Sequence, residues 1–294
     1  MEKLNYKARA KINLALDVCR RLENGYHEIK TVMQSVNIYD ELEFKRRRDP
    51  DIILSVDSRY ELGDLGNNLI FRAAKFMKEY YGIRQGIEIH LKKTIPVAAG
   101  MAGGSTDAAA TMLAMNEMFA LKLDKEELMR QGLRLGADIP FCILGGTALA
   151  EGVGEKLTPL PAPPRASLLV VKPPIMVSTK RVYETLRVNQ IAKHPDIDGM
   201  MAALEQGDIE RVANYLENVM EAVTVKENSI IAEIKTMMTQ QGAYNALMSG
   251  SGPSVFGIFA KEEEAQAAAK HIRSALKAKK MASQVFVTEF YNPF

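Results

Sequence analysis

The sequence predicts an α+β protein of two domains, and three observations support this. Its 294 residues exceed the roughly 150 residues of an average domain. Segments with the period of a strand and segments with the period of a helix both occur. Four prolines fall within the six residues 159–164, and proline continues neither a helix nor a central strand. We therefore place a linker there and expect domains at residues 1–158 and 165–294.

The first domain is expected to begin with strands and to end with helices. Apolar residues alternate over Lys11–Val18 and over Glu41–Lys45, which is the period of a half-buried strand. Asn68–Tyr81 carries its apolar side chains at helical spacing. The remaining predicted elements are a strand at Ile87–Leu91, a helix from near Gly104 and a helix opening at Asp124.

The second domain shows a different order of elements. Strands are predicted at Leu168–Lys172, Tyr244–Met248, Val255–Ala260 and Gln284–Thr288, with helices between Ser178 and Gln240 and at Glu262–Leu276. If the helices before Gln240 count as one connection, the order is β-α-β-β-α-β, which is ferredoxin-like.

Composition limits the possible partners. The formal net charge is only +2, so no overall field attracts the protein to nucleic acid or to a membrane surface. Cys19 and Cys142 form no CxxC pair, which favours a reducing compartment. No run of 18 apolar residues and no N-terminal signal-peptide pattern occurs. We expect a cytoplasmic protein with no nucleic-acid partner and no membrane association.

The segment Pro96–Asp107 is the first candidate site. It reads PVAAGMAGGSTD and lies between a predicted strand and a predicted helix. Small residues let backbone N–H groups close around an anion, and a helix N-terminus adds partial positive charge. Ser105 and Thr106 can offer hydroxyls to phosphate or Mg²⁺. On the glycines alone, a tight turn before a capped helix is an equal alternative. Walker, Rossmann and protein-kinase motifs are all missing.

Three further segments carry polar groups that could serve chemistry. Asp138 lies in an apolar turn bounded by Gly136 and Pro140, where it could also be a turn residue that bonds nearby backbone. Lys11 and Asn13 share one face of a mostly apolar strand. Asn24–His27 reads as a turn that presents an aromatic ring beside an imidazole, or as ordinary surface residues.

Together and in this order, these segments resemble the GHMP kinase superfamily, which includes galacto-, homoserine, mevalonate and phosphomevalonate kinases. The resemblance runs from Lys7 to about Thr288. Pro96–Asp107 and Met248–Pro253 carry the superfamily pattern. A narrower resemblance, to kinases of a cytidine diphosphate-linked methylerythritol, rests on Ala10–Leu14, Gly25–His27, Asn67–Ile70, Gly136–Pro140 and Glu151–Glu155.

The resemblance implies a fold and a reaction. The implied fold is the two-domain GHMP kinase fold, with an N-terminal ribosomal-protein-S5-domain-2-like α/β domain, a C-terminal ferredoxin-like domain and an active site in the cleft between them. The implied reaction transfers the γ-phosphate of ATP, with Mg²⁺, to the 2-hydroxyl of the cytidine-linked alcohol in non-mevalonate isoprenoid biosynthesis. A monomer or weak homodimer is expected.

The resemblance also implies residue roles. Asp138 becomes the base and Lys11 its catalytic partner, while Asn13 and Thr179 lie nearer the erythritol and Tyr26, His27 and Tyr183 hold the cytosine. The ATP cradle consists of Pro96, Val97, Ala98, Ala99, Gly100, Met101, Ala102, Gly103, Gly104, Ser105 and Thr106, with Asn68 near the adenine and Ser105 as the Mg²⁺ ligand.

The chain departs from the family pattern at several positions. Met101 stands where Leu is usual, Ala102 where Gly is usual, and Tyr183 where Phe is common. Because alanine disfavours a positive φ, we expect that residue 102 does not need one.

Two rival functions remain open at this point. Another GHMP kinase, acting on mevalonate or homoserine, would share the glycine segment but would not need Gly25–His27. A non-catalytic ligand sensor on the same scaffold would bind without turnover, and the presence of both Lys11 and Asp138 argues against it.

Overall fold

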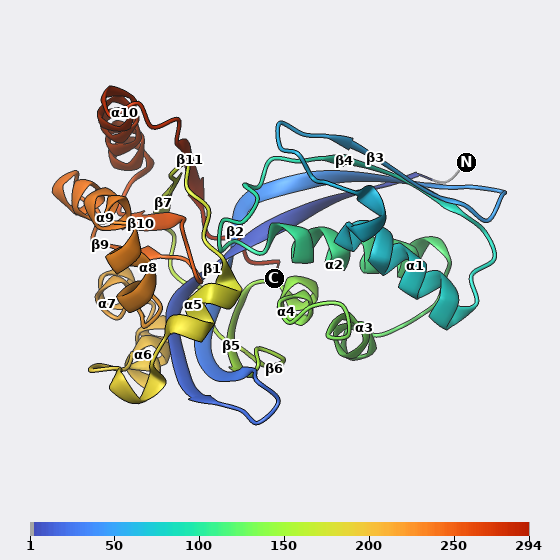
Figure 1. The fold of residues 1–294 in the computed structure, drawn as a ribbon, viewed down its shortest axis with the longest axis horizontal. Helices are drawn as coiled ribbons and strands as arrows, with labels where there is room; N and C mark the ends of the chain where they lie inside the picture. Colours follow the sequence, from blue (N-terminus) through green and yellow to red (C-terminus); the bar gives the residue numbers. More distant parts are fainter. Residues whose placement is uncertain (1–2, 294) are drawn as a thin grey trace. The chain divides into compact units, whose positions relative to one another are not determined.

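A computed structural model describes residues 3–293. The described chain forms two compact units (Figure 1). The first contains residues 3–10, 38–97 and 102–144, and the second contains residues 11–37, 98–101 and 145–293. The long strands β1 (Lys3–Arg21) and β2 (His27–Arg46) contribute residues to both units.

The first unit packs helices on a mixed sheet. Its strands lie in the order β3-β4-β2-β1, with β3 at Ile52–Asp57 and β4 at Ile87–Lys92. β4 runs parallel to β3 and antiparallel to β2. The helices of this unit are η1 (Leu65–Asn67), α1 (Leu69–Tyr81), α2 (Gly103–Met118), α3 (Lys125–Gly132) and α4 (Ile139–Leu144).

The core of the first unit follows from its helices. α1 buries the predicted face of Ile70, Ala73, Ala74 and Met77. Its ends are set by the Asn68 side chain, which caps the N-terminus, and by Gly82 in the left-handed conformation. α2 is buried along most of its length and packs against α1 and α4. Its start, which follows the glycine segment, is thereby fixed on the core.

The second unit contains two sheets. One has the order β6-β5-β2-β1-β8, with β5 at Thr147–Gly152, β6 at Lys156–Pro159 and β8 at Glu217–Asn218. The other has the order β11-β7-β10-β9, with β7 at Ser167–Lys172, β9 at Asn245–Met248, β10 at Val255–Phe259 and β11 at Gln284–Glu289. The helices are α5 (Thr179–Thr185), η2 (Val188–Gln190), α6 (Ile197–Gln206), α7 (Ile209–Asn214), α8 (Glu221–Glu227), α9 (Ile230–Gln240) and α10 (Glu262–Ala278).

The four-stranded sheet confirms the ferredoxin-like prediction. All its neighbouring strands are antiparallel, and in chain order they lie fourth, first, third, second. The α+β class is therefore confirmed. Within residues 3–293, no helix combines the length and apolar character needed to cross a bilayer.

The strands of the first half are longer and more numerous than predicted. β1 and β2 extend well beyond the alternating segments, and β3, β5 and β6 were not predicted; nor was the two-residue β8 later in the chain. The proline-rich stretch lies between β6 and β7, both in the second unit. The two domains predicted at residues 1–158 and 165–294 therefore remain a prediction.

The backbone before α2 contains left-handed residues. Ala98, Gly100 and Ala102 have φ of +50°, +72° and +56°. The expectation that residue 102 does not need a positive φ is therefore wrong. Alanine can adopt this conformation at a cost of roughly 1–2 kcal/mol, so the residue type did not reveal the backbone geometry.

We predict that Ala102→Gly raises the free energy of unfolding by about 0.5–1 kcal/mol. Glycine removes the left-handed strain, and part of the gain is offset by its greater freedom in the unfolded chain. The exposed Ala267 in α10 gives a matched control, because the same change in a helix interior lowers stability by about 1 kcal/mol. Urea unfolding should show a higher free energy of unfolding in Ala102→Gly and a lower one in Ala267→Gly than in the wild type. A loss of stability in both variants would contradict the strain at residue 102.

Candidate functional site

The segment that leads into α2 presents unpaired backbone donors. The N–H groups of residues 98–102 make no hydrogen bond within residues 3–293. Alternate residues of this segment are left-handed, a pattern that turns successive N–H groups toward an anion. The N-terminus of the 16-residue helix α2 follows directly. This combination of free N–H groups and a helix N-terminus is suited to phosphate oxygens.

The two glycines at the start of α2 have different surroundings. A Cβ at Gly103 would lie 2.9 Å from Ile95 Cγ2 and 3.0 Å from Lys93 Nζ, so a side chain there would require these neighbours to shift. A Cβ at Gly104 would meet only Leu69 Cδ1, at 3.4 Å. A side chain is therefore accommodated less easily at residue 103 than at residue 104.

The two hydroxyls of this segment differ in availability. Thr106 is buried and its Oγ1 donates to the Arg9 carbonyl at 2.6 Å. Ser105 is half-buried, and its hydroxyl makes no hydrogen bond within the described chain. Ser105 is thus the hydroxyl that remains available to a phosphate or a cation.

Asp138 lies in the turn before α4, near the start of α2. A Cβ on Gly136, two residues earlier in the chain, would be 3.9 Å from Ser105 Oγ. The backbone carbonyl of Asp138 accepts from Cys142 N at 3.0 Å, while its half-buried carboxylate has no partner among residues 3–293. The structure therefore brings the Asp138 turn and the Ser105 hydroxyl into one neighbourhood.

Asn68 has a structural role as a helix cap, which the sequence alone did not distinguish from a role in binding. Its Oδ1 accepts from Ile70 N at 2.9 Å and caps α1. The next residue, Leu69, is the one nearest to Gly104. Asn68 is thus held close to the start of α2, with its Nδ2 not engaged by any described residue.

Lys11 and Asn13 form a buried polar chain in the second unit. Lys11 Nζ donates to Asn13 Oδ1 at 2.8 Å, and Asn13 Nδ2 donates to Thr31 Oγ1 at 2.9 Å. The Thr31 hydroxyl donates in turn to the Ala15 carbonyl at 2.6 Å. This chain fixes the ammonium of Lys11 in a single orientation.

The second unit also holds the glycine-rich stretch 249–252 beside Gly100. Ser249 Oγ donates to the Gly100 carbonyl at 2.9 Å, and a Cβ on Gly100 would lie 2.1 Å from the Ser249 carbonyl oxygen. Asn218 Nδ2 donates to the carbonyls of Met248 and Gly250, both at 2.8 Å. The stretch thus contacts Gly100 through a serine hydroxyl and through a backbone approach too close for a Cβ at residue 100.

Thr179 and the predicted cytosine residues lie in the second unit. Thr179 Oγ1 is 2.8 Å from Ser251 Oγ. The rings of His27 and Tyr183 are stacked, with centroids 5.0 Å apart and planes at 22°. Tyr26 exposes 63% of its surface, and Asn24 Oδ1 accepts from its backbone N–H. The exposed Tyr26 ring is thus next in the chain to His27, whose ring stacks on Tyr183 of α5.

The electrostatics at His27 favour its neutral form. Burial lowers the pKa of the imidazole below its ordinary value of 6.5, and the nearby Arg21 lowers it further. A neutral imidazole offers one donor and one acceptor.

A buried charged cluster, which sequence reasoning missed, lies beneath the start of α2. Lys93 Nζ donates to Asp40 Oδ2 and, at 2.7 Å, to Asp107 Oδ2. The side chains are 5%, 0% and 4% exposed, respectively. Burial lowers the pKa of Lys93, but the two carboxylates outweigh this and raise it. Burial raises the pKa of Asp107 well above its usual range.

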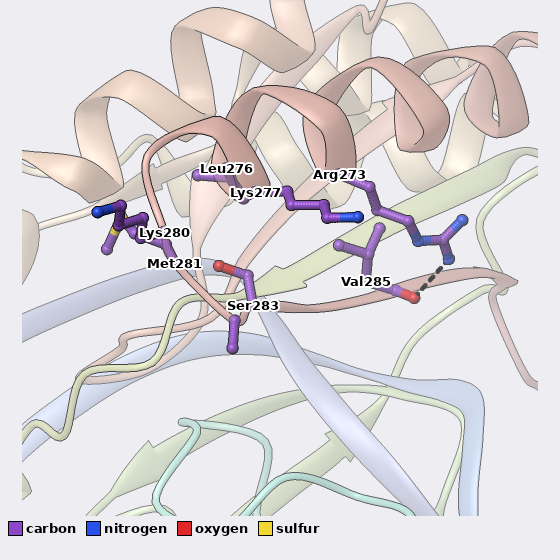
Figure 2. A pocket seen from close by; sticks show the side chains of 8 residues that line it. Arg273, Leu276, Lys277, Lys280, Met281, Ser283 and Val285 are labelled. Atoms are coloured by element: carbon purple, nitrogen blue, oxygen red, sulfur yellow. Dashed lines mark hydrogen bonds between the residues drawn. The ribbon is translucent and has the colours of Figure 1, made fainter.

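A separate pocket lies between α10 and β11 (Figure 2). Its volume is about 350 Å³, and Arg273, Lys277 and Lys280 line it. Arg273 donates to the Val285 carbonyl at 2.8 Å. Lys277 lies in the last turn of α10, where positive charge stabilises the helix carbonyls, and Lys280 follows the helix. None of the predicted site residues lines this pocket.

The donor set suits a magnesium nucleotide rather than a protein cage. No group of three His, Cys, Asp or Glu side chains that could hold a metal ion occurs within residues 3–293. Mg²⁺ is commonly held by one or two protein ligands, waters and the phosphates of a nucleotide. The free Ser105 hydroxyl at the start of α2 fits that mode of binding.

Comparisons with known proteins identify the family of the chain. Residues 68–146 match the GHMP kinases N terminal domain, and residues 200–278 match the GHMP kinases C terminal domain. The chain is 46% identical to 4-diphosphocytidyl-2-C-methyl-D-erythritol kinase of Lachnoclostridium phytofermentans, over 99% of this chain and 98% of that protein. It is 47% identical to the kinase of the same name from Lachnospira eligens, over the full length of both.

A solved structure agrees as well. The crystal structure of a 4-(cytidine 5'-diphospho)-2C-methyl-D-erythritol kinase is 30% identical and superimposes with a TM-score of 0.82, covering 98% of this chain and 100% of that one. The chain therefore belongs to the GHMP kinases, which are ATP-dependent small-molecule kinases, and within them to the 4-diphosphocytidyl-2-C-methyl-D-erythritol kinase family.

Proposed function

We propose that this protein transfers the γ-phosphate of ATP to the 2-hydroxyl of 4-diphosphocytidyl-2-C-methyl-D-erythritol, giving ADP and the 2-phosphate, in non-mevalonate isoprenoid biosynthesis. The observation that carries the proposal is the row of unpaired N–H groups at residues 98–102 ahead of α2. The near full-length identity to kinases of that name supports the choice of alcohol.

In this proposal Pro96–Thr106 cradles the triphosphate. Phosphoryl transfer depends mostly on positioning and on stabilising charge that spreads over the phosphoryl oxygens. Backbone N–H groups supply that stabilisation without reorganising during the reaction. Asn68 lies near the adenine, because its side chain caps α1 next to the start of α2.

Asp138 is proposed as the base and Lys11 as its catalytic partner. A carboxylate without a hydrogen-bond partner in the described chain is free to accept the hydroxyl proton of the alcohol. That proton is transferred late, when the oxygen has already become acidic, so an ordinary carboxylate suffices. Lys11, oriented by Asn13, would offset negative charge on the phosphoryl group.

Mg²⁺ is the proposed metal, with Ser105 as its protein ligand. When bound, the ion would neutralise charge on the β- and γ-phosphates. The Ser105 hydroxyl supports this role because no described residue occupies it.

The cytidine end is assigned to the second unit's aromatic residues. Tyr26 and Tyr183 would stack on the pyrimidine, and neutral His27 would supply a donor and an acceptor to its edge. Asn13 and Thr179 lie nearer the erythritol in this assignment. A cytoplasmic location and a monomeric or weakly dimeric state complete the proposal, and sedimentation measurements would test the latter.

One assay separates the proposal from its rivals. ADP release is measured with the cytidine-linked alcohol, mevalonate and homoserine in parallel. We expect turnover with the first alone. Turnover of mevalonate or homoserine instead would place the protein with another GHMP kinase, and binding without turnover would indicate a sensor.

Replacing Asp138 with Asn is predicted to lower kcat by roughly 10²–10⁴-fold, the usual contribution of a general base. The KM for ATP should change little, because Asn has the same size and the phosphate cradle is untouched. Steady-state kinetics with both substrates would measure this. Turnover within a few-fold of the wild type would remove Asp138 from the role of base.

Tyr26→Ala is predicted to weaken the binding of the cytidine substrate and to leave the binding of ATP unchanged. Losing one stacking partner costs about 1–3 kcal/mol, or roughly a 5- to 150-fold rise in that substrate's KM where KM follows affinity. Tyr80→Ala is a control, because it also removes a half-exposed tyrosine ring but lies on α1. Equal effects of the two variants on the cytidine substrate would contradict the assignment.

The neutral state of His27 predicts a pH dependence. Because its pKa lies below 6.5, the KM of the cytidine substrate should stay constant from pH 8 to 7. It should rise as the pH falls through that pKa, since protonation removes the acceptor. His27→Gln keeps a donor and an acceptor without titrating, so its profile should stay flat. A rise of the same size in His27→Gln would show that another group is responsible.

A further inference from the structure

The segment that leads into the phosphate loop is held at a single point. Asp40 Oδ1 accepts from the N–H groups of Thr94 and Ile95, at 2.6 and 2.8 Å. Its other oxygen accepts from Lys93. These three bonds therefore fix the residues that follow β4 and precede Pro96.

The helix that leaves the loop is held to the same lysine. Lys93 Nζ donates to Asp107 Oδ2 at 2.7 Å, and Asp107 lies in the second turn of α2. The ammonium also lies 3.0 Å from the place where a Cβ on Gly103 would be. Both ends of the loop thus meet at one buried ammonium, and all these residues belong to the first unit.

Stability alone does not account for the cluster. A buried ion pair seldom adds net stability, because desolvation cancels much of the attraction. Here two carboxylates share one ammonium, and Asp107 Oδ1 has no hydrogen-bond partner within residues 3–293. An arrangement that is not favoured by stability alone suggests that the cluster fixes a geometry that the protein uses.

We propose that Lys93 is a positioning residue for ATP: its ammonium joins the entry of the phosphate loop, through Asp40, to the exit of the loop, through Asp107. This inference rests on the proposed use of the loop as the triphosphate cradle. Loop N–H groups that are held in place in the absence of ATP bind phosphate without a further loss of conformational entropy. Removing this link between the two ends of the loop should therefore weaken the binding of ATP and leave the binding of the alcohol substrate unchanged.

The sharpest test is a matched pair at position 107. Asp107→Leu removes the acceptor while leaving Lys93 paired with Asp40, so no buried charge is left alone. Asp107→Asn has nearly the same shape as Asp and keeps an oxygen that accepts from Lys93. We expect the Kd for MgATP, measured by titration without any alcohol, to rise at least tenfold in Asp107→Leu and to stay within about threefold in Asp107→Asn.

A structural control and a second route complete the test. Met77→Ala removes a buried side chain of the same core and should lower the melting temperature without changing the Kd for MgATP. Lys93→Met, which removes the ammonium itself, should raise the Kd as Asp107→Leu does. An unchanged Kd in Asp107→Leu, or an equal rise in Met77→Ala, would overturn the proposal.

The outcome is independent of which alcohol is phosphorylated. Titration with MgATP compares the variants even if the wild type fails to phosphorylate the cytidine substrate. In the kinase assay, Asp107→Leu should raise the KM for ATP and keep the KM for the alcohol within twofold of the wild-type value. A rise in both KM values would indicate general damage to the fold and would also contradict the positioning role.

Discussion

The buried ammonium of Lys93 sets the geometry on which the phosphate loop depends. A charge removed from water is tolerated only where partners surround it, and Asp40 and Asp107 are those partners. Because Asp40 also accepts two backbone N–H groups, the chain direction after β4 is fixed to the same point. The ammonium lies so near residue 103 that a side chain there would displace it, so Gly103 serves the cluster as well as the proposed ligand.

A rigid loop matters because of the chemistry assigned to it. Phosphoryl transfer leaves the protein little covalent work, so its contribution is to hold donors where charge develops. Donors on a loop with several conformations would lose affinity in proportion to the fraction of time spent out of position. In the first unit the buried cluster holds the loop ends, and in the second unit Ser249 and Asn218 support the glycine-rich stretch beside Gly100.

Much of this structure could be predicted from the sequence, and the reason is periodicity. The apolar face of α1 and the ferredoxin-like order both followed from the spacing of apolar residues. Most of the unpredicted strands are short, as β6 is, and in β3 the exposed apolar Ile53 hides the alternation. The long β1 is buried on both faces over much of its length, so alternation does not mark its ends.

The charged cluster was missed although periodicity contained a signal for it. Asp40 shares the strand face of Leu42 and Phe44, and Lys93 continues the face of Ile87, Ile89 and Leu91. A charged residue in phase with buried neighbours is either at the end of a strand or paired inside. The sequence cannot choose between the two, because the partner Asp107 is 14 residues from Lys93 on a helix.

The error at Ala102 has a different origin. Residue type limits the cost of a backbone conformation but does not determine which conformation occurs. Alanine in the left-handed region costs one or two kcal/mol, which a well-packed framework can impose. Ala98 and Ala102 carry this strain on either side of Gly100, and α2, buried along its length, fixes the chain immediately after residue 102. Strained residues tend to gather where a protein holds its backbone ready for a ligand. The strain at the two alanines thus supports the proposed use of this segment as a phosphate cradle.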